Sequence, residues 1–410
     1  MKLNLNLFNL PQALVYGLVI TSLFVFTGCE ENETDGVNCN TPDEAGELVS
    51  QTFLQTFSPA QVEPLLALYG APVGLTLSHT ANAYKIEYMT RDKDDELTLA
   101  SGIMFVPQNA SDIDVVSIQH GTVLKRDNVG SSNALYAIDA MLFAMNGYMT
   151  VAADYIGLGV STDMHPYLHA ELSTNAVVDM LRAARIYGCE NDLDISDNLF
   201  LAGYSEGGYA TMASHKLMEE QYADEFQLAG VAPMSGPYDL IGSMRNYLMK
   251  ESFETPAFLA YVAASYDDIY GWGLLGDMFN EPYATQLPTL FDGTQSLGDV
   301  NAQLPQTISE LFRAEFLTSF FAGEEAEIQG AIEENTLLGW GPIAPVRLYH
   351  GMADSTVSIN NTYNAYHSLR ASGGTSVDIV PLPGADHSGG FFISMVLAEA
   401  WFDSLSAVVQ

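Results

Sequence analysis

The sequence predicts an α/β fold in which helices flank a mostly parallel β-sheet. Short apolar runs alternate with helical patterns along the 410 residues, as in consecutive βαβ units. Polar or glycine-rich loops follow these runs, and the chain is 48% hydrophobic, which allows a large buried core. Because ligands bind beyond the carboxyl ends of parallel strands, we expect the functional residues in those loops.

The individual strands and helices are predicted from the spacing of their apolar residues. The predicted strands are short apolar runs within 84–106 (two runs) and at 115–118, 148–153, 199–204, 228–234, 346–349 and 377–382. The predicted helices span 171–187, 206–220, 358–369 and a terminal segment that ends near 406. The charged run 91–96 separates the first two strands, so we expect an exposed hairpin loop there and not a metal site.

One segment, from about residue 243 to 335, interrupts the alternation of strands and helices. It has few strand signals, so we expect a mostly helical insertion between the sixth and seventh predicted strands. The insertion starts at the ligand-binding edge of the sheet, which favours a cap that covers the site and supplies an apolar pocket. The alternative is a structural subdomain with a small core of its own. Its first half is rich in aromatic residues: Phe253, Phe258, Tyr261, Tyr266, Tyr270, Trp272 and Phe279.

Ser205 lies at the centre of a G-x-S-x-G pattern that begins at Gly203 and ends at Gly207. The pattern alone is weak evidence, because glycine and serine are common residues. Here an apolar run precedes it and a helical pattern follows it, which is the context of a nucleophile elbow. The two glycines have no Cβ, so strand and helix can approach closely around the serine. The alternative is a glycine-rich turn with an incidental serine.

A serine nucleophile needs a base and an acid that orients the base. His387 follows the last predicted strand and is the candidate base, and Asp354 follows the preceding strand and is the candidate acid. Asp386 is a rival acid, but it adjoins His387 in the chain and is poorly placed to reach Nδ1. Asp354 could instead cap a turn, and His387 could be a surface histidine. His120 and His350 stand at strand ends, where we expect structural roles.

An oxyanion hole requires two N–H groups beside the nucleophile. One is expected from Glu206, the residue after Ser205, and the other from the loop that follows the third predicted strand. Within that loop Thr122 is the candidate donor, and Gly121 shapes the turn.

The first 28 residues are predicted as a lipoprotein signal peptide. An apolar stretch at 13–26 is too short for an easy membrane span. Thr27 and Gly28 then precede Cys29, and small residues before a cysteine resemble a bacterial lipobox, so Cys29 is the predicted lipidation site. The alternatives are an ordinary signal peptide or a single anchor helix. The polar, acidic segment after Cys29 is expected to be a tether.

Two further cysteines, Cys39 and Cys189, follow the predicted lipidation site. Export favours a disulfide, which would join the N-terminal segment to the turn after the helix that ends near residue 187. The alternative is two unpaired buried thiols.

The charge of the chain is strongly negative. There are 14 Lys and Arg against 51 Asp and Glu, a net charge of −37. Such a surface repels nucleic acid and anionic lipid head groups, so we expect no nucleic-acid partner. The acidic residues are spread along the chain, which indicates a heavily solvated surface.

Together these motifs resemble the secretory lipase and bacterial esterase family of α/β-hydrolases. The likeness covers about 84–407: Ser205 lies in an elbow similar to that of the family, and the blocks 154–159, 165–168 and 179–185 are similar to the family's sequence ahead of it. The order Ser, Asp, His matches the α/β-hydrolase order. The resemblance implies hydrolysis of carboxylic esters, a helical lid and no metal requirement, and we expect no cofactor. The block that starts at Asp154 is expected to shape the pocket rim and not to be catalytic.

We therefore expect a lipid-anchored esterase or lipase, exported to the bacterial outer membrane, that acts on small-molecule or lipid esters with short to medium acyl chains or an aromatic acid. A serine peptidase of the prolyl-oligopeptidase type is the first alternative, although the segment before residue 84 is too short for a β-propeller. A non-catalytic binding protein with this fold is the second. The expected division of the chain is signal peptide 1–28, tether 29–45, core 46–242, cap 243–340 and core 341–410.

Overall fold

A nine-stranded mixed sheet organises the part of the chain that the computed structural model describes, residues 44–71 and 77–409. The strands lie in the order β1-β2-β3-β5-β4-β6-β7-β8-β9. Pairing is antiparallel from β1 to β5 and parallel from β5 through β4 to β9. The bounds are Leu48–Phe57 (β1), Ala81–Arg91 (β2), Leu97–Pro107 (β3), Ile113–Gln119 (β4), Met149–Ala153 (β5), Ile195–Tyr204 (β6), Leu228–Met234 (β7), Val346–Gly351 (β8) and Val377–Leu382 (β9).

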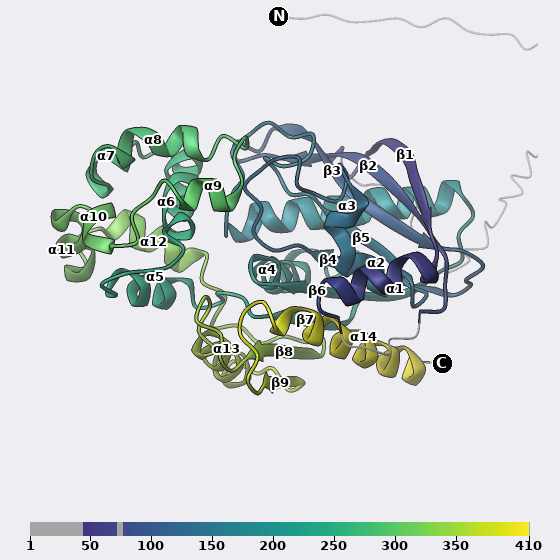
Figure 1. Ribbon diagram of the computed structural model, residues 1–410. Coiled ribbons are helices and arrows are strands. Elements are labelled where there is room, and N and C mark those ends of the chain that lie inside the picture. The colour runs from purple at the N-terminus through teal and green to yellow at the C-terminus, as the bar shows by residue number, and fades with distance from the viewer. Residues whose placement is uncertain (1–43, 72–76, 410) are drawn as a thin grey trace, which may run out of the picture. The chain divides into compact units, whose positions relative to one another are not determined.

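Helices cover both faces of the sheet, which confirms the predicted fold class (Figure 1). Successive residues of a strand point to opposite faces. Phe200 of β6 therefore packs with α2 and α14, whereas Leu201 packs with α3. The helices of the core are α1 (Pro59–Leu68), the 3-10 turn η1 (Ala134–Ala137), α2 (Ile138–Ala144), α3 (Ala170–Glu190), α4 (Glu206–Gln221), α13 (Asn360–Ala371) and α14 (Gly390–Val409).

Apart from the 3-10 turn η1, three elements outside the insertion were not among the predicted ones: β1, α1 and α2. β1 is an edge strand whose residues are mostly exposed, so it lacks the apolar run that marks a buried strand. α2 has seven residues and all of them are buried, so it shows no amphipathic period. Because β1 precedes the first predicted strand, the insertion lies between β7 and β8, the seventh and eighth strands.

The segment between β7 and β8 is helical, as Figure 1 shows in green beyond α4. Its buried side chains form one cluster with α4 and α13 of the core, so the segment does not pack only on itself. That this segment acts as a lid over the site is still a prediction. The insertion helices are α5 (Leu240–Leu248), α6 (Pro256–Tyr270), α7 (Leu275–Met278), α8 (Tyr283–Leu290), α9 (Leu297–Asn301), α10 (Ile308–Leu311), α11 (Ala314–Ala322) and α12 (Ala326–Glu334).

The predicted signal peptide, Cys29 and Cys39 lie outside the described residues. Cys189 is disulfide-bonded, and it stands in the last turn of α3 and not in the turn after it, because the helix runs three residues further than predicted. The pairing of Cys189 with Cys39 remains a prediction. Within 44–71 and 77–409, no helix combines the length and hydrophobicity that a membrane crossing requires.

Candidate active site

Ser205 occupies a sharp turn between β6 and α4. Its φ of 62° and ψ of −121° lie where non-glycine residues are rare, and holding a residue there costs about 1–3 kcal/mol. The backbone N–H of Ser205 donates to the carbonyl oxygen of Met234 in β7, which fixes the turn to the neighbouring strand (2.9 Å). The turn lifts the side chain away from the strand and sets it at the N-terminus of α4.

Glycines on both sides of Ser205 permit this turn. A Cβ on Gly203 would lie 2.4 Å from the carbonyl oxygen of Gly207. A Cβ on Gly207 would lie 1.9 Å from the carbonyl oxygen of Gln119, at the end of β4. The expected close approach of strand and helix is therefore present, and it includes a second strand that the motif alone did not indicate.

The structure brings Ser205, His387 and Asp354 together in one chain of hydrogen bonds. His387 Nε2 lies 3.0 Å from Ser205 Oγ, and His387 Nδ1 lies 2.6 Å from Asp354 Oδ2. The rival acid, Asp386, instead accepts a hydrogen bond from the backbone N–H of Gly389 at 2.7 Å. These distances suit proton transfer between the serine and the imidazole.

Asp354 is buried, and its environment favours the carboxylate. Its Oδ1 accepts hydrogen bonds from the backbone N–H groups of Thr356 and Val357, so it also caps the turn. Burial by itself would raise the pKa of the Asp354 carboxyl. Hydrogen bonds from His350 and His387 and the charge on His387 outweigh burial and lower that pKa to about 2.

His350 lies beside Asp354. From the sequence we expected only a structural role for it, at the end of a strand. It is fully buried, and its Nε2 lies 3.3 Å from Asp354 Oδ2 and 2.9 Å from the carbonyl oxygen of Val357. Its Nδ1 lies 2.6 Å from Thr362 Oγ1, a hydroxyl that can donate. An Nε2–H tautomer satisfies all three contacts, so His350 helps to orient the same carboxylate oxygen that His387 contacts.

Tyr204 holds the backbone of His387. Its hydroxyl donates to the His387 backbone carbonyl at 2.6 Å, and the two rings lie 5.2 Å apart. Sequence reasoning missed this contact. The only local signal was an aromatic residue directly before the elbow serine.

Two of the predicted oxyanion-hole residues, Glu206 and Gly121, lie next to Ser205. Glu206 is the first residue of α4, and the first N–H groups of a helix have no acceptor within that helix and carry partial positive charge. A Cβ on Gly121 would lie 3.8 Å from Ser205 Cβ, which brings the loop after β4 within reach of the serine. Thr122 follows in that loop, and its Oγ1 lies 3.0 Å from the Tyr167 hydroxyl. His120 is held by backbone contacts, in agreement with its expected structural role.

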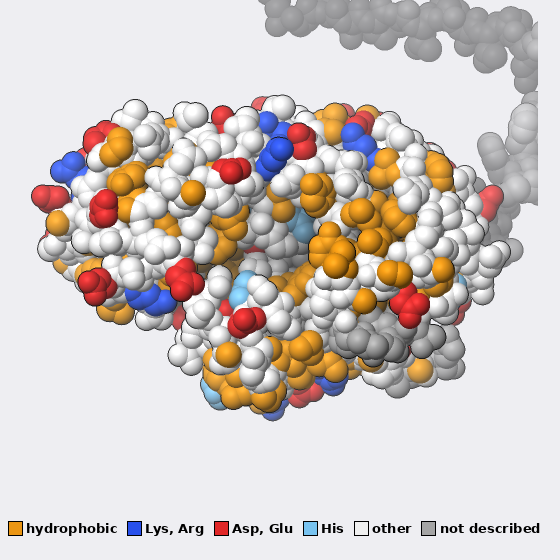
Figure 2. Space-filling model, in the orientation of Figure 1, with side chains coloured by type: hydrophobic (Ala, Val, Ile, Leu, Met, Phe, Trp, Pro, Cys, Tyr) orange, Lys and Arg blue, Asp and Glu red, His pale blue; other side chains and the backbone are white. Residues whose placement is uncertain are grey.

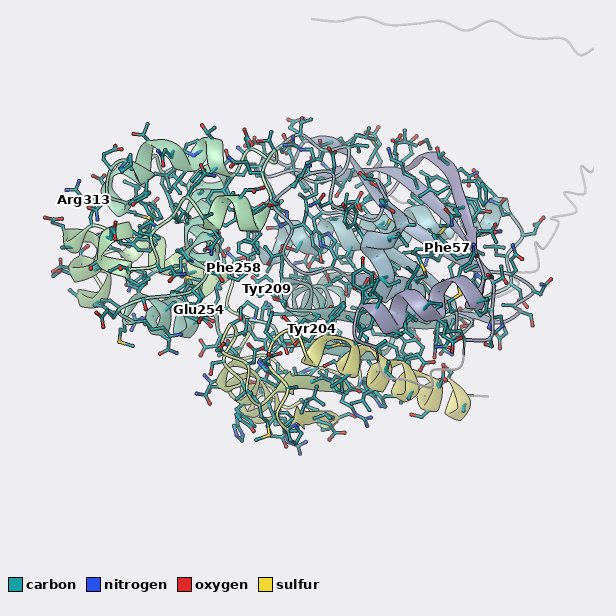
Figure 3. The ribbon with its side chains drawn as sticks, in the orientation of Figure 1. Phe57, Tyr204, Tyr209, Glu254, Phe258 and Arg313 are labelled. Atoms are coloured by element: carbon teal, nitrogen blue, oxygen red, sulfur yellow. The ribbon has the colours of Figure 1, made fainter. Side chains whose placement is uncertain are left out.

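The insertion meets the core beside this loop. Figure 2 shows a hollow on this face, and Phe258 of the insertion, labelled in Figure 3, stacks on Tyr167 of the core with 6.5 Å between ring centres. The Tyr209 hydroxyl donates to the carbonyl oxygen of Asn335 at 2.8 Å. Arg126, four residues beyond Thr122, donates to the carbonyl oxygen of Asp292 at 3.1 Å. The insertion is thus tied to the core through α4 and through the loop after β4.

A known protein family matches the part of the chain that contains the elbow. The model of the secretory lipase family matches residues 130–255, which include Ser205 and the start of the insertion. No curated protein matches the sequence.

Solved structures resemble the chain over nearly all of its described length. A Legionella pneumophila protein assigned as a hydrolase is 30% identical, with a TM-score of 0.82 over 87% of this chain and 98% of that one. The rice cell wall degrading esterase LipA from Xanthomonas oryzae is 26% identical, with a TM-score of 0.78 over 88% and 97% of the two chains. Candida antarctica lipase A in its closed state, 17% identical with a TM-score of 0.67 over 88% and 83%, shares the fold.

Gly207→Ala tests the close approach at the elbow. The new Cβ would meet a backbone oxygen that cannot move without shifting β4, so we expect a loss of about 1–3 kcal/mol in the free energy of unfolding and a marked loss of activity. Urea unfolding followed by circular dichroism measures the first quantity.

Gly330→Ala is the matched control for this substitution. Gly330 is an exposed residue inside α12 with open space around it, so alanine should stabilise that helix by about 0.5–1 kcal/mol. Equal stability changes in the two variants would contradict the role assigned to Gly207.

Proposed function

Because the chain belongs to the secretory lipase and bacterial esterase family of α/β-hydrolases and is a carboxylic ester hydrolase, we propose that it cleaves esters through an acyl-enzyme on Ser205. The observation that carries this proposal is the continuous hydrogen-bonded chain Ser205–His387–Asp354. The strained position of the serine at the start of α4 supports it.

Acylation begins with the Ser205 hydroxyl. Its Oγ forms a bond to the ester carbonyl carbon while its proton passes to His387 Nε2. The tetrahedral intermediate then collapses, the bond to the alcohol oxygen breaks, and His387 returns the proton to that oxygen. Asp354 keeps Nδ1–H in place and stabilises the imidazolium. Because the pKa of its carboxyl is lowered, Asp354 stays a carboxylate throughout these steps.

Deacylation repeats these steps with water as the nucleophile. His387 removes a proton from water, the hydroxide oxygen bonds to the acyl carbon, and the acid leaves as the Ser205 oxygen regains a proton. In both halves the carbonyl oxygen becomes negative. The N–H groups of Glu206 and Thr122 are proposed to bind that oxygen, with Gly121 allowing the loop to approach Ser205.

The proposed substrates are esters of short to medium acyl chains or of aromatic acids. An aromatic stack begins at Tyr167, whose hydroxyl contacts Thr122 of the proposed oxyanion loop. Tyr167 stacks on Tyr261 at 4.6 Å, and Tyr261 stacks on Phe291 at 4.6 Å. The three rings are buried, so they form a rigid apolar wall behind the Thr122 loop, and a rigid wall favours a compact or flat acyl group over a long flexible one.

A panel of p-nitrophenyl esters, from acetate to palmitate and including an aromatic acid, tests the chemistry and the chain length. Ser205→Ala should lower kcat/KM by about 10⁴-fold or more, because the nucleophile is lost. The panel should favour the short, medium and aromatic members. Full activity of Ser205→Ala would refute the mechanism, and cleavage of a peptide substrate with no ester turnover would favour the peptidase alternative.

Ser214→Ala is the matched control within the same helix. Ser214 is buried in α4, and its hydroxyl has no hydrogen-bond partner among the described residues, so its removal should leave ester hydrolysis unchanged.

For localisation, we propose that the chain is an exported bacterial lipoprotein of the outer membrane, anchored through a lipid on Cys29. The family is one of secretory enzymes, which supports export. Intact mass and membrane fractionation test the anchor: the natural chain should carry a lipid and sediment with membranes, and Cys29→Ser should do neither. A lipid on the Cys29→Ser protein would exclude this site.

A further inference from the structure

The two residues proposed to form the oxyanion hole are held by one short segment of the loop after β5. His165 Nε2 lies 2.6 Å from Glu206 Oε1, and the Tyr167 hydroxyl lies 3.0 Å from Thr122 Oγ1. Pro166 stands between the two and limits the backbone freedom of the segment. One segment of three residues therefore contacts both sides of the proposed hole, at positions more than 40 residues away in the chain.

The contact between His165 and Glu206 contains a shared proton. His165 Nδ1 lies 3.0 Å from the carbonyl oxygen of Ile156, which can only accept, so Nδ1 carries a hydrogen. The contact between Nε2 and Oε1 needs one more hydrogen. The pair is therefore either imidazolium with carboxylate or neutral imidazole with carboxylic acid, and it is electrically neutral in both forms.

This pair is out of contact with water, so each member depends on the other. Both side chains are 2% exposed. Glu206 Oε2 is also buried and has no hydrogen-bond partner among the described residues, which leaves His165 as the group that compensates the carboxyl. A buried acidic side chain at the first position of α4 thus has its position dictated by His165.

Aromatic rings fix the segment on both sides. Tyr155 stacks on His165 with 5.6 Å between ring centres and 14° between planes, and Tyr261 of α6 stacks on Tyr167 at 4.6 Å and 14°. Gly157 lets the loop fold back, because a Cβ there would lie 2.4 Å from the His165 backbone nitrogen. Burial and then the nearby Glu206 carboxyl raise the pKa of Tyr167 well above its usual range, so its hydroxyl keeps its proton.

We propose that the His165–Tyr167 segment is a positioning clamp for the oxyanion hole, in which His165 sets the Glu206 end of α4 and Tyr167 sets the Thr122 loop. The clamp touches neither substrate nor reacting atoms. It rests on the proposed function, since it concerns the N–H groups that would bind the developing oxyanion. A role in shaping the pocket rim was expected for the preceding block 154–159, and the contacts of His165 and Tyr167 give residues 165–167 a role of their own.

Tyr167→Phe removes the clamp's hydroxyl and retains its ring stack. Displacing one oxyanion donor should lower kcat roughly 10-fold, because a misplacement of about 1 Å costs up to 10²-fold, and should leave KM within about twofold. Binding of a trifluoromethyl ketone, which forms a negatively charged adduct on the serine, should weaken by the same factor as kcat. Thr122→Val should act similarly, and the double variant should be no worse than either single one.

Tyr266→Phe is the matched control. It removes a buried tyrosine hydroxyl of α6 that donates to the carbonyl oxygen of Leu168 at 2.8 Å, one residue beyond the clamp. Its melting temperature should fall about as much as that of Tyr167→Phe, with kcat unchanged. Equal kinetics in these two variants would overturn the clamp.

Glu206→Gln tests the contact between His165 and Glu206. We expect kcat to fall by roughly 10- to 100-fold with little change in KM. Full activity in that variant would overturn the role of the His165–Glu206 contact, and if the variant does not fold, the Tyr167 and Thr122 variants decide the proposal.

Ser205→Ala distinguishes a failure of the proposed function from a failure of the clamp. Activity that survives in Ser205→Ala refutes the proposed function itself, whereas an inactive Ser205→Ala with fully active clamp variants refutes only the clamp.

Discussion

The close contact between the first turn of α4 and the end of β4 sets the position of the whole site. Only glycine fits at Gly207, because a Cβ would lie 1.9 Å from the Gln119 carbonyl oxygen. This approach places the N-terminus of α4, with its unpaired N–H groups, beside the loop that contains Gly121 and Thr122. The same turn holds Ser205 at a φ of 62°, a strained conformation that the contacts to β4 and β7 maintain. Packing of the backbone thus converts a common sequence pattern into a specific geometry.

Topology supplies the remaining partners. β6 lies inside the sheet with β7, β8 and β9 on one side and β4 on the other. Since all of these strands are parallel, their carboxyl ends share one edge, and residues more than 180 positions apart in the chain meet there. Asp354 follows β8 and His387 follows β9, and each is oriented by a second group, His350 for the carboxylate and Tyr204 for the histidine backbone. The insertion then packs against the same edge, where Tyr261 of α6 stacks on Tyr167 and the carbonyl oxygen of Asp292 accepts a hydrogen bond from Arg126 of the core.

Much of the fold and the candidate site could be predicted from the sequence, since apolar runs mark buried strands and the elbow, Asp354 and His387 each follow one. The predictions missed elements without that signal: β1 is largely exposed, and α2 is too short and too buried to show a period. They also missed contacts that exist only in three dimensions. The pairing of His165 with Glu206 joins residues 41 positions apart, and neither residue carries a local pattern that names its partner.

The most direct test of the account is covalent modification of the proposed nucleophile. Diethyl p-nitrophenyl phosphate transfers its phosphoryl group to an activated serine and releases p-nitrophenol, so released product, remaining esterase activity and peptide mass can be followed together. We predict that one p-nitrophenol is released per chain, that activity falls in proportion, and that the added mass lies on the peptide that contains Ser205. Ester hydrolysis that persists when Ser205 is fully modified would contradict this prediction.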